Sequence, residues 1–265
     1  MVDLDDTGSE GEGAESKLRD AVVPVRSGKL HADHLTQQAP SEVLLEHSDF
    51  QVRLASSRGR RSKSSVLVNR MYSWRGYKGT ARADEPSNPN LITLQACRED
   101  EVFGTLTLGL DSDAGLAADA LYPAEIDDYR KAGKRVCEIT RLAIDFEHGS
   151  KDVFGALFHL AYIYGGLLRG ATDVFIEVNP RHVVFYKRML NFREAGPCRI
   201  CERVDAPAVL LHLEARYMEE QIALHGGHQS GAKRSLYPYF FSSQEQEGLA
   251  RRLAVLSPKD AGFRG

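Results

Sequence analysis

The sequence lacks the features that would place the protein in a membrane or in a secretory pathway. It contains no run of about 18 consecutive apolar residues, which is the length that a membrane-spanning helix needs. Its first residues are acidic and do not form a basic segment followed by an apolar stretch. We therefore expect a cytoplasmic protein without a signal peptide or a transmembrane segment.

Cysteine is also scarce, and the histidines follow no ligand pattern. Four cysteines are few for 265 residues. Cys198 and Cys201 form a single close pair, with no second pair to complete a zinc site. The histidine spacings match no metal motif, and no serine or cysteine nucleophile motif accompanies them. We expect no metal, and we interpret four histidines as structural: His148, His159, His182 and His212.

Strong net charge is missing as well, because the formal charge is only -3 at pH 7. This balance predicts no general attraction to nucleic acid. The local composition is more informative. Residues 1–45 combine Asp and Glu with Gly and Ser, which predicts a disordered acidic segment. Residues 46–220 are predicted to form one domain, and residues 221–265 a partly helical C-terminal extension.

The hydrophobic pattern predicts an α/β (α+β) domain whose mixed, mainly antiparallel central sheet is flanked by helices. Alternating or continuous apolar runs indicate strands, apolar stripes at helical spacing indicate helices, and a Pro- and Asn-rich stretch at 83–90 indicates a loop. The predicted strands are 49–55, 91–96, 102–109, 135–145, 173–178, 198–203 and 209–214. The predicted helices are 63–77, 116–132, 151–169 and 182–190. The extension, with residues 236–241, either covers a substrate tunnel or packs on the core.

Several segments resemble one enzyme superfamily. The run from Val174 to Phe192, with Asn179, Phe185 and Tyr186, is similar to the fifth strand and fourth helix of GNAT-fold acyltransferases. Residues 137–145 resemble the Glu-x-x-Arg signature of acyl-homoserine-lactone synthases, a related group that takes its acyl chain from acyl carrier protein. Together with residues 70–77 and 104–111, they look most like long-chain N-acyl amino acid synthases of the FeeM type. The resemblance covers about residues 48 to 245 and implies a GNAT-like fold.

The resemblance also bears on the acyl donor. Acetyl-CoA enzymes of this fold follow the fourth strand with a Gly-rich loop that holds pyrophosphate. Residues 146–153 have one glycine and two acidic side chains, which would repel that group. We therefore expect the phosphopantetheine thioester of acyl carrier protein as donor, with no permanently bound cofactor. The acidic carrier would dock on basic clusters, unless these are solvated helix ends: Arg58, Arg60, Arg61 and Lys63, or Arg130, Lys131, Lys134 and Arg135.

Three residues are the catalytic candidates. Glu138 is predicted to take the proton from the ammonium group of the acceptor, as a partly buried carboxylate with a raised pKa could do. Alternatively, Glu138 and Arg141 form a structural pair. Because they lie three residues apart on a strand, a direct contact would require twist or a bulge. Tyr186 is the candidate that protonates the leaving thiolate, unless it only packs against the core.

The expected substrate-binding residues lie on segments that the resemblance places around the pocket. Arginines would bind the carboxylate of an amino acid, and aromatic side chains would line the acyl chain or the acceptor, unless they simply pack. Three aromatic residues at 72, 74 and 77 cannot share one helix face, so at least one is predicted to be exposed or to line a cavity. Asn179 would bind the pantetheine arm or cap a helix. The set is Arg70, Tyr72, Trp74, Arg75, Tyr77, Arg141, Ile144 and Asn179.

The resemblance implies an N-acyltransferase that joins a long-chain fatty acyl group to the α-amine of an amino acid by direct attack. Backbone N–H groups near the fourth strand would meet the oxyanion. The alternatives are an acyl-homoserine-lactone-type synthase that uses S-adenosylmethionine, a CoA-dependent GNAT N-acetyltransferase, and a non-catalytic module that binds acyl carrier protein. Contact with a membrane surface is expected only through the lipid product. The acceptor, the chain length and the oligomeric state stay open.

Overall fold

The computed structural model describes residues 42–78, 88–145, 147, 150–228 and 234–264. Glu42–Gly265 form one compact unit. Most of the predicted acidic segment and most of the predicted loop at 83–90 lie outside the described residues. The sequence did not predict the strand at Val43–Glu46, which pairs with the next strand.

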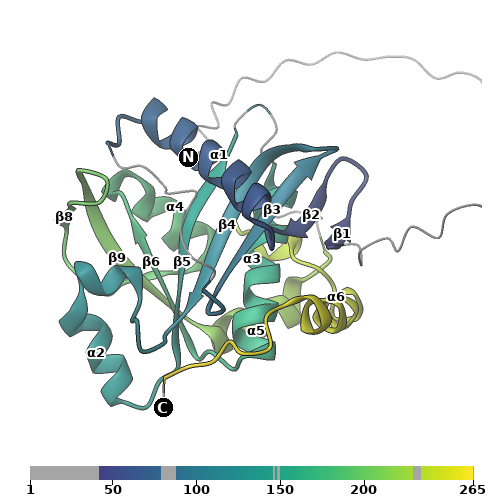
Figure 1. Ribbon diagram of the computed structural model, residues 1–265. Helices are drawn as coiled ribbons and strands as arrows, with labels where there is room; N and C mark the ends of the chain where they lie inside the picture. Colours follow the sequence, from purple (N-terminus) through teal and green to yellow (C-terminus); the bar gives the residue numbers. More distant parts are fainter. Residues whose placement is uncertain (1–41, 79–87, 146, 148–149, 229–233, 265) are drawn as a thin grey trace, which may run out of the picture. The chain divides into compact units, whose positions relative to one another are not determined.

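Nine strands in the described part of the chain form the sheet, and Figure 1 shows them running through the middle of this unit. Their order is β1-β2-β3-β4-β5-β6-β9-β7, and β8 pairs with β9. β5 and β6 run parallel, while the other described pairs run antiparallel. The predicted mixed, mainly antiparallel sheet is thus confirmed. The strands are β1 (Val43–Glu46), β2 (Gln51–Leu54), β3 (Leu91–Arg98), β4 (Glu101–Leu110), β5 (Val136–Ile144), β6 (Asp173–Val178), β7 (Arg193–Glu194), β8 (Arg199–Cys201) and β9 (Ala206–Glu214).

Helices cover both faces of the sheet (Figure 1). One face carries α1 (Arg58–Trp74), the 3-10 helix η1 (Ala117–Ala120) and α2 (Pro123–Lys131). The other face carries α3 (Lys151–Tyr162), its π-helical continuation η2 (Ile163–Leu168), α4 (Pro180–Leu190), α5 (Ala215–His225), the 3-10 helix η3 (Tyr237–Tyr239) and α6 (Ser243–Leu256). We call these the α1 face and the α3 face.

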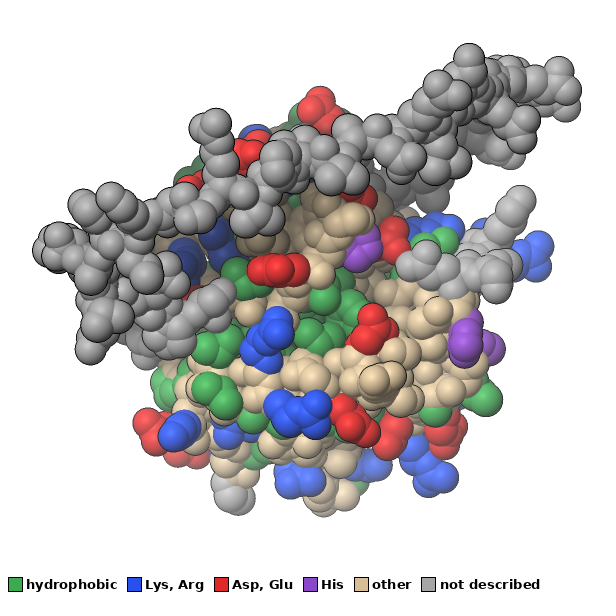
Figure 2. Space-filling view, turned by 90° about the vertical axis from the view of Figure 1, so that its right-hand side faces the viewer, with side chains coloured by type: hydrophobic (Ala, Val, Ile, Leu, Met, Phe, Trp, Pro, Cys, Tyr) green, Lys and Arg blue, Asp and Glu red, His purple; other side chains and the backbone are tan. Residues whose placement is uncertain are grey.

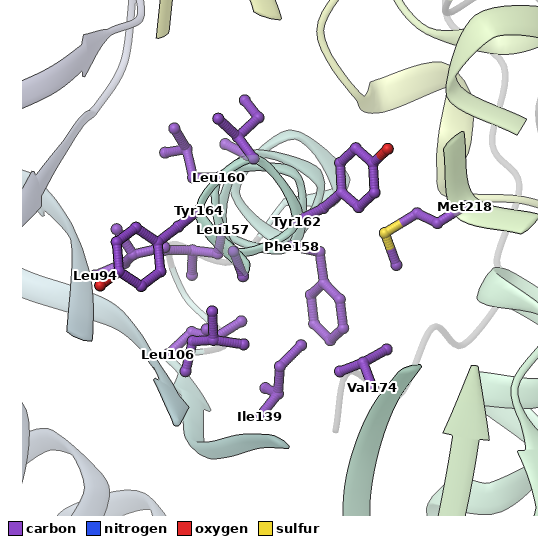
Figure 3. Packing of buried hydrophobic residues seen from close by; sticks show 14 of the residues in the cluster. Leu94, Leu106, Ile139, Leu157, Phe158, Leu160, Tyr162, Tyr164, Val174 and Met218 are labelled. Carbon is purple, nitrogen blue, oxygen red and sulfur yellow. The ribbon is translucent and has the colours of Figure 1, made fainter. Parts of the chain in front are cut away.

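The main hydrophobic core lies on the α3 face. Figure 3 shows Leu157 and Phe158 of α3 pointing at Leu106, Ile139 and Val174 of the sheet. A fully buried side chain of this size contributes roughly 1.5–3 kcal/mol relative to an exposed one. This core therefore fixes the strands on which the functional side chains lie.

Two predicted helices are interrupted in the structure. The stretch 116–132 divides into η1 and α2, because Pro123 begins a new helix at its first position, where its missing N–H costs nothing. The stretch 151–169 remains α-helical only to Tyr162 and then widens into η2. Gly165 allows that turn to approach the sheet, since a Cβ there would lie 3.0 Å from Leu108.

The C-terminal segment packs on the core, which was one of the two possibilities left open above. His159 of α3 is fully buried, and its Nδ1 accepts a hydrogen bond from the Phe241 backbone N–H at 2.9 Å. Its Nε2 lies 2.8 Å from Oε1 of Gln246 in α6. Gly155 contacts the same segment, because a Cβ there would lie 2.7 Å from the Tyr239 carbonyl oxygen. These contacts join residues 237–246 to α3.

Candidate active site

The sheet opens into a fork where β5 and β6 separate. Their parallel pairing covers four residue pairs and ends at Ile139 and Ile176. Beyond that point β5 continues beside β4, and β6 continues beside β9. The separation coincides with a β-bulge, because the β4 register shifts by one residue around Arg141, whose φ is 51°. A bulge bends its strand and increases the local twist, which turns β5 away from β6.

Glu138 lies on β5 just before the fork, on the α1 face. Its side chain is buried, and its two carboxylate oxygens accept hydrogen bonds from the backbone N–H groups of Ala117 at 2.6 Å and Ala118 at 3.0 Å. Burial raises the pKa of the Glu138 carboxyl to about 7, against the opposing effect of these two hydrogen bonds. A carboxylate has about four lone-pair positions, so it retains capacity to accept a proton.

The bulge that a direct Glu138 and Arg141 contact would require is present, with Arg141 at its centre. The hydrogen bonds of the Glu138 carboxylate go to η1, however, so the carboxylate holds this helix against the sheet. Two further charged residues affect the pKa of the Glu138 carboxyl. Arg203 lowers the pKa of its carboxyl and Glu177 raises it.

Tyr186 lies on α4, beside the β6 limb of the fork. Its ring is surrounded by aromatic rings of α3, α4 and the segment after α4, at centroid distances of 5.3–6.4 Å: Phe154, Phe158, Phe185 and Phe192. Burial raises the pKa of the Tyr186 hydroxyl well above its usual value. The hydroxyl therefore stays protonated near neutral pH and can donate a hydrogen bond, although it is a weaker acid than a free tyrosine.

The C-terminal end of α1 reaches the same region. Tyr72 and Tyr77 contact each other edge to face at 5.6 Å, and the Tyr77 hydroxyl accepts a hydrogen bond from Arg181 of α4 at 2.9 Å. Burial raises the pKa of Tyr72 to about 12, and burial lowers the pKa of Arg75. Trp74 is 70% exposed, as expected for one of the three aromatic residues. The segment that follows α1 thus contacts α4.

Three other predicted binding residues have structural partners. Arg70 donates to Asp145 at 2.6 Å. Ile144 belongs to the hydrophobic core on the α3 face. Asn179 caps α4, since its Oδ1 accepts a hydrogen bond from the Arg181 N–H at 3.2 Å. The cap is the second of the two roles that the sequence left open for Asn179.

Neither predicted docking cluster lies at the fork. Lys134 and Arg135 precede β5, whose other end forms the fork. Arg130 is largely buried among three aspartates: Asp111, Asp119 and Asp127. Arg58, Arg60, Arg61 and Lys63 lie at the start of α1, a helix of 17 residues that spans about 25 Å and reaches the fork only at its other end. Among these, Arg60 pairs with Glu42.

One charged pair at the fork was not anticipated from the sequence. Glu177 lies on β6 beyond the last parallel pair and receives a hydrogen bond from Arg203 at 2.7 Å. The alternation of side chains along β6 places Glu177 on the same face as Phe175, which pairs with Glu138. This alternation could have identified Glu177. Arg203 follows β8 in a turn, and no local pattern marks it.

In the described residues, no helix has the length and apolar character needed to cross a bilayer.

The histidines that the sequence assigned to structural roles include His212, which bonds to Asp173 at 2.7 Å. His148 lies outside the described residues.

Comparison with known proteins places this geometry in a family. The model of the N-acyl amino acid synthase FeeM family matches residues 63–214, which is more than half of the chain. The structure is similar to that of FeeM, an N-acyl amino acid synthase from uncultured soil microbes, with 24% identity and a TM-score of 0.59. That similarity covers 63% of this chain and 92% of FeeM.

Weaker structural similarities extend to other acyltransferases. A putative N-acetyltransferase from Lactobacillus plantarum has 14% identity and a TM-score of 0.46, covering 63% of this chain and 99% of that one. The AHL synthase LasI has 12% identity and a TM-score of 0.40, covering 64% and 91%. No curated protein matches the sequence. On the family match over the residues that build the fork, this chain belongs to the N-acyl amino acid synthase FeeM family and is an acyltransferase.

Proposed function

We propose that this enzyme transfers a long-chain fatty acyl group from the phosphopantetheine thioester of acyl carrier protein to the α-amine of an amino acid. The acceptor nitrogen attacks the thioester carbon, the C–N bond forms, and the C–S bond breaks. The products are an N-acyl amino acid and the free thiol of the carrier. The observation that carries the proposal is the fork itself, with Glu138 on the β5 limb and Tyr186 on α4, the helix that follows the β6 limb.

The two side chains fit the two steps that this reaction needs. An amino acid arrives as an ammonium ion, and Glu138, with its pKa raised to about 7, takes the proton directly or through a water molecule. Tyr186 keeps its proton near neutral pH and donates a hydrogen bond to the leaving thiolate, which needs little further help because thiolate is a good leaving group. Backbone groups of β5 beyond Ile139 are released from the parallel ladder and line the fork, where they can meet the oxyanion.

The connection between β5 and α3 supports a carrier protein over CoA as donor. Where a CoA enzyme would offer free N–H groups, the Glu147 N–H donates to Asp145 at 3.2 Å, and the Val153 N–H at the start of α3 donates to Ser150 at 3.3 Å. The side chains of Asp145 and Glu147 add negative charge to this connection between β5 and α3. A carrier presents its phosphopantetheine without the adenosine pyrophosphate that such a loop would have to bind.

Direct attack is supported by the state of the thiols. Burial raises the pKa of Cys97, Cys137 and Cys201, so these groups stay protonated and are poor nucleophiles. Cys201 is the one close to Glu177 and Arg203. A covalent acyl-enzyme would need a thiolate there, and burial opposes its formation.

We propose that the carrier docks on the exposed side of α4, in place of the two clusters remote from the fork. Arg181 and Arg188 are exposed on this helix, which begins at the β6 limb. Figure 2 shows a different face, where the described Lys, Arg, Asp and Glu side chains are interspersed and give no large patch of one sign. Acidic carriers bind surfaces of concentrated positive charge. The charge reversal R188E is expected to raise the KM for the carrier substrate severalfold, and R251E on α6 is the matched control.

The test of the reaction uses purified protein, dodecanoyl acyl carrier protein and each standard amino acid, with product detection by mass spectrometry. Formation of an N-dodecanoyl amino acid, lost in E138Q and reduced in Y186F, is the expected result. Dodecanoyl-CoA at the same concentration should give a much lower rate. Equal rates with CoA would refute the carrier assignment, and product only with S-adenosylmethionine would assign a lactone-type synthase instead.

A further inference from the structure

A pocket of about 260 Å³ lies beneath α1. Its walls come from the first half of α1, from β3 and β4, and from the chain after α6, and it extends to Arg141 at the bulge. The fork chemistry described above does not use this volume. Its location between the bulge and the start of α1 makes it a second compartment that adjoins the active site.

The lining of this pocket combines apolar side chains, among them Leu54, Leu91 and Ile92, with hydroxyl and guanidinium groups. Ser64, Ser65, Thr93 and Thr107 contribute four hydroxyl groups, and Arg61 and Arg141 contribute two guanidinium groups. None of the described lining residues is acidic. The Thr93 and Thr107 hydroxyls lie 2.8 Å apart, which uses one of their two hydrogens and leaves the other to donate elsewhere.

The contacts of the Arg61 side chain indicate that one hydrogen-bond acceptor is missing. Its Nη1 donates to the Ser56 carbonyl oxygen at 2.7 Å, which anchors the guanidinium. Its Nε is buried and has no hydrogen-bond partner among the described residues. A buried donor without an acceptor is costly, and such groups commonly indicate a ligand or an ion.

The polar part of the pocket lies on the same face of the sheet as Glu138. Gly109 pairs with Glu138, and Thr107, two residues earlier on β4, therefore has its side chain on that same face. The opposite face, which Figure 3 shows, is apolar around Phe158, Ile139 and Val174. The two substrates of the proposed reaction also differ in polarity, since the acyl group is a hydrocarbon chain and the amino acid is a zwitterion.

We infer that the pocket beneath α1 binds the amino acid acceptor, and that it selects acceptors whose side chains carry a hydrogen-bond acceptor. Arg141, beside the fork, binds the α-carboxylate, and the acceptor side chain extends along Thr93 and Thr107 toward the Nε of Arg61. A hydrocarbon chain in this position would leave the buried Nε of Arg61 without an acceptor. The inference rests on the proposed function and assigns the specificity of its acceptor.

Steady-state kinetics test the assignment. R61Q is expected to raise the KM for the preferred amino acid roughly tenfold or more, and T107V, which removes one hydroxyl at constant shape, severalfold. The KM for dodecanoyl carrier protein and the preferred chain length should not change in either variant. R251Q on α6 and T172V at the opposite end of the sheet are the matched controls. A changed chain-length preference in T107V, with an unchanged acceptor KM, would assign the pocket to the acyl chain and overturn the inference.

Direct binding separates this inference from the proposed reaction. Calorimetry of the full chain with single amino acids, and with dodecanoyl-N-acetylcysteamine as an uncharged acyl probe, needs no turnover. Amino acids with acidic, amide or hydroxyl side chains should bind to the wild type, and R61Q and T107V should bind them more weakly while melting normally. If R61Q does not fold, R61K and T107V serve the same purpose. Tightest binding of leucine or phenylalanine, binding of none, or loss of only the acyl probe in T107V would refute it.

Discussion

Replacement of Glu138 by glutamine tests how a buried carboxylate can serve both structure and catalysis. Burial raises the pKa of this group from 4.5 to about 7. The folded state therefore holds the proton more tightly than the unfolded state, and between these two pH values the folded protein carries more protons. Stability must then fall as pH rises through this window, by about 1.36 kcal/mol per unit and about 3 kcal/mol in total.

The glutamine variant should behave differently because it does not ionise. Its amide oxygen can accept from Ala117 or Ala118, but its NH₂ group then faces the other N–H, and an unsatisfied buried donor costs roughly 1–3 kcal/mol. We expect E138Q to be less stable than the wild type at pH 5. At pH 8 the two should have similar stability, since the wild type then carries the cost of its buried charge.

Urea denaturation at pH 5 and pH 8 measures this difference, and the acyl transfer assay at the same pH values measures catalysis. Loss of the proton acceptor is expected to reduce kcat about 10²–10⁴-fold at pH 8, where the variant is folded. In the wild type, kcat/KM should rise with pH to a plateau above about 7. A stability difference that stays constant between pH 5 and 8 would refute the raised pKa. Full activity of E138Q would remove Glu138 as the base.

Three further predictions follow from the ion pairs and the buried histidine. R203Q should move the midpoint of the kcat/KM pH profile upward, because Arg203 lowers the pKa of Glu138. E177Q should move it downward, because Glu177 raises that pKa. Shifts of both variants in the same direction would contradict this electrostatic account. H159L should lower the free energy of unfolding by roughly 2–5 kcal/mol, since two buried hydrogen bonds are lost. Burial lowers the pKa of His159 to about 4, so the wild type should lose stability as pH falls below 6.5, and H159L should lose less; calorimetry at pH 7 and 5 checks both. R130A should cost roughly 1–3 kcal/mol in urea denaturation, because Asp119 and Asp127 lose the hydrogen bonds of the guanidinium while Asp111 keeps its pair with Arg264. No measurable loss of stability would contradict this account.

The C-terminal segment shows a limit of pattern reading. Its helical and aromatic content is visible in the sequence, but its position is decided by contacts that are distant along the chain. Gly155 gives space for the Tyr239 carbonyl, and His159 supplies the partner of the Phe241 N–H. Neither residue is marked by periodicity, because a glycine and a histidine inside an apolar helix look like ordinary variation.

The sequence by itself determined the fold class and the order of most elements, and it indicated Glu138 and Tyr186 as catalytic candidates. These follow from local periodicity and from short segments that resemble a known superfamily. It did not show that the two predicted basic clusters lie away from the fork, since charge runs do not reveal where a helix points.

Only the tertiary structure decided what surrounds the candidate residues. The bulge at Arg141, the hydrogen bonds from η1 to Glu138, the pair of Glu177 with Arg203 and the hydroxyl-lined pocket beneath α1 all join residues far apart in sequence. The pKa of a carboxyl group and the polarity of a cavity depend on burial and on neighbours. Both are properties of the packed chain, because side chains from separate elements become neighbours only when the sheet and its helices assemble.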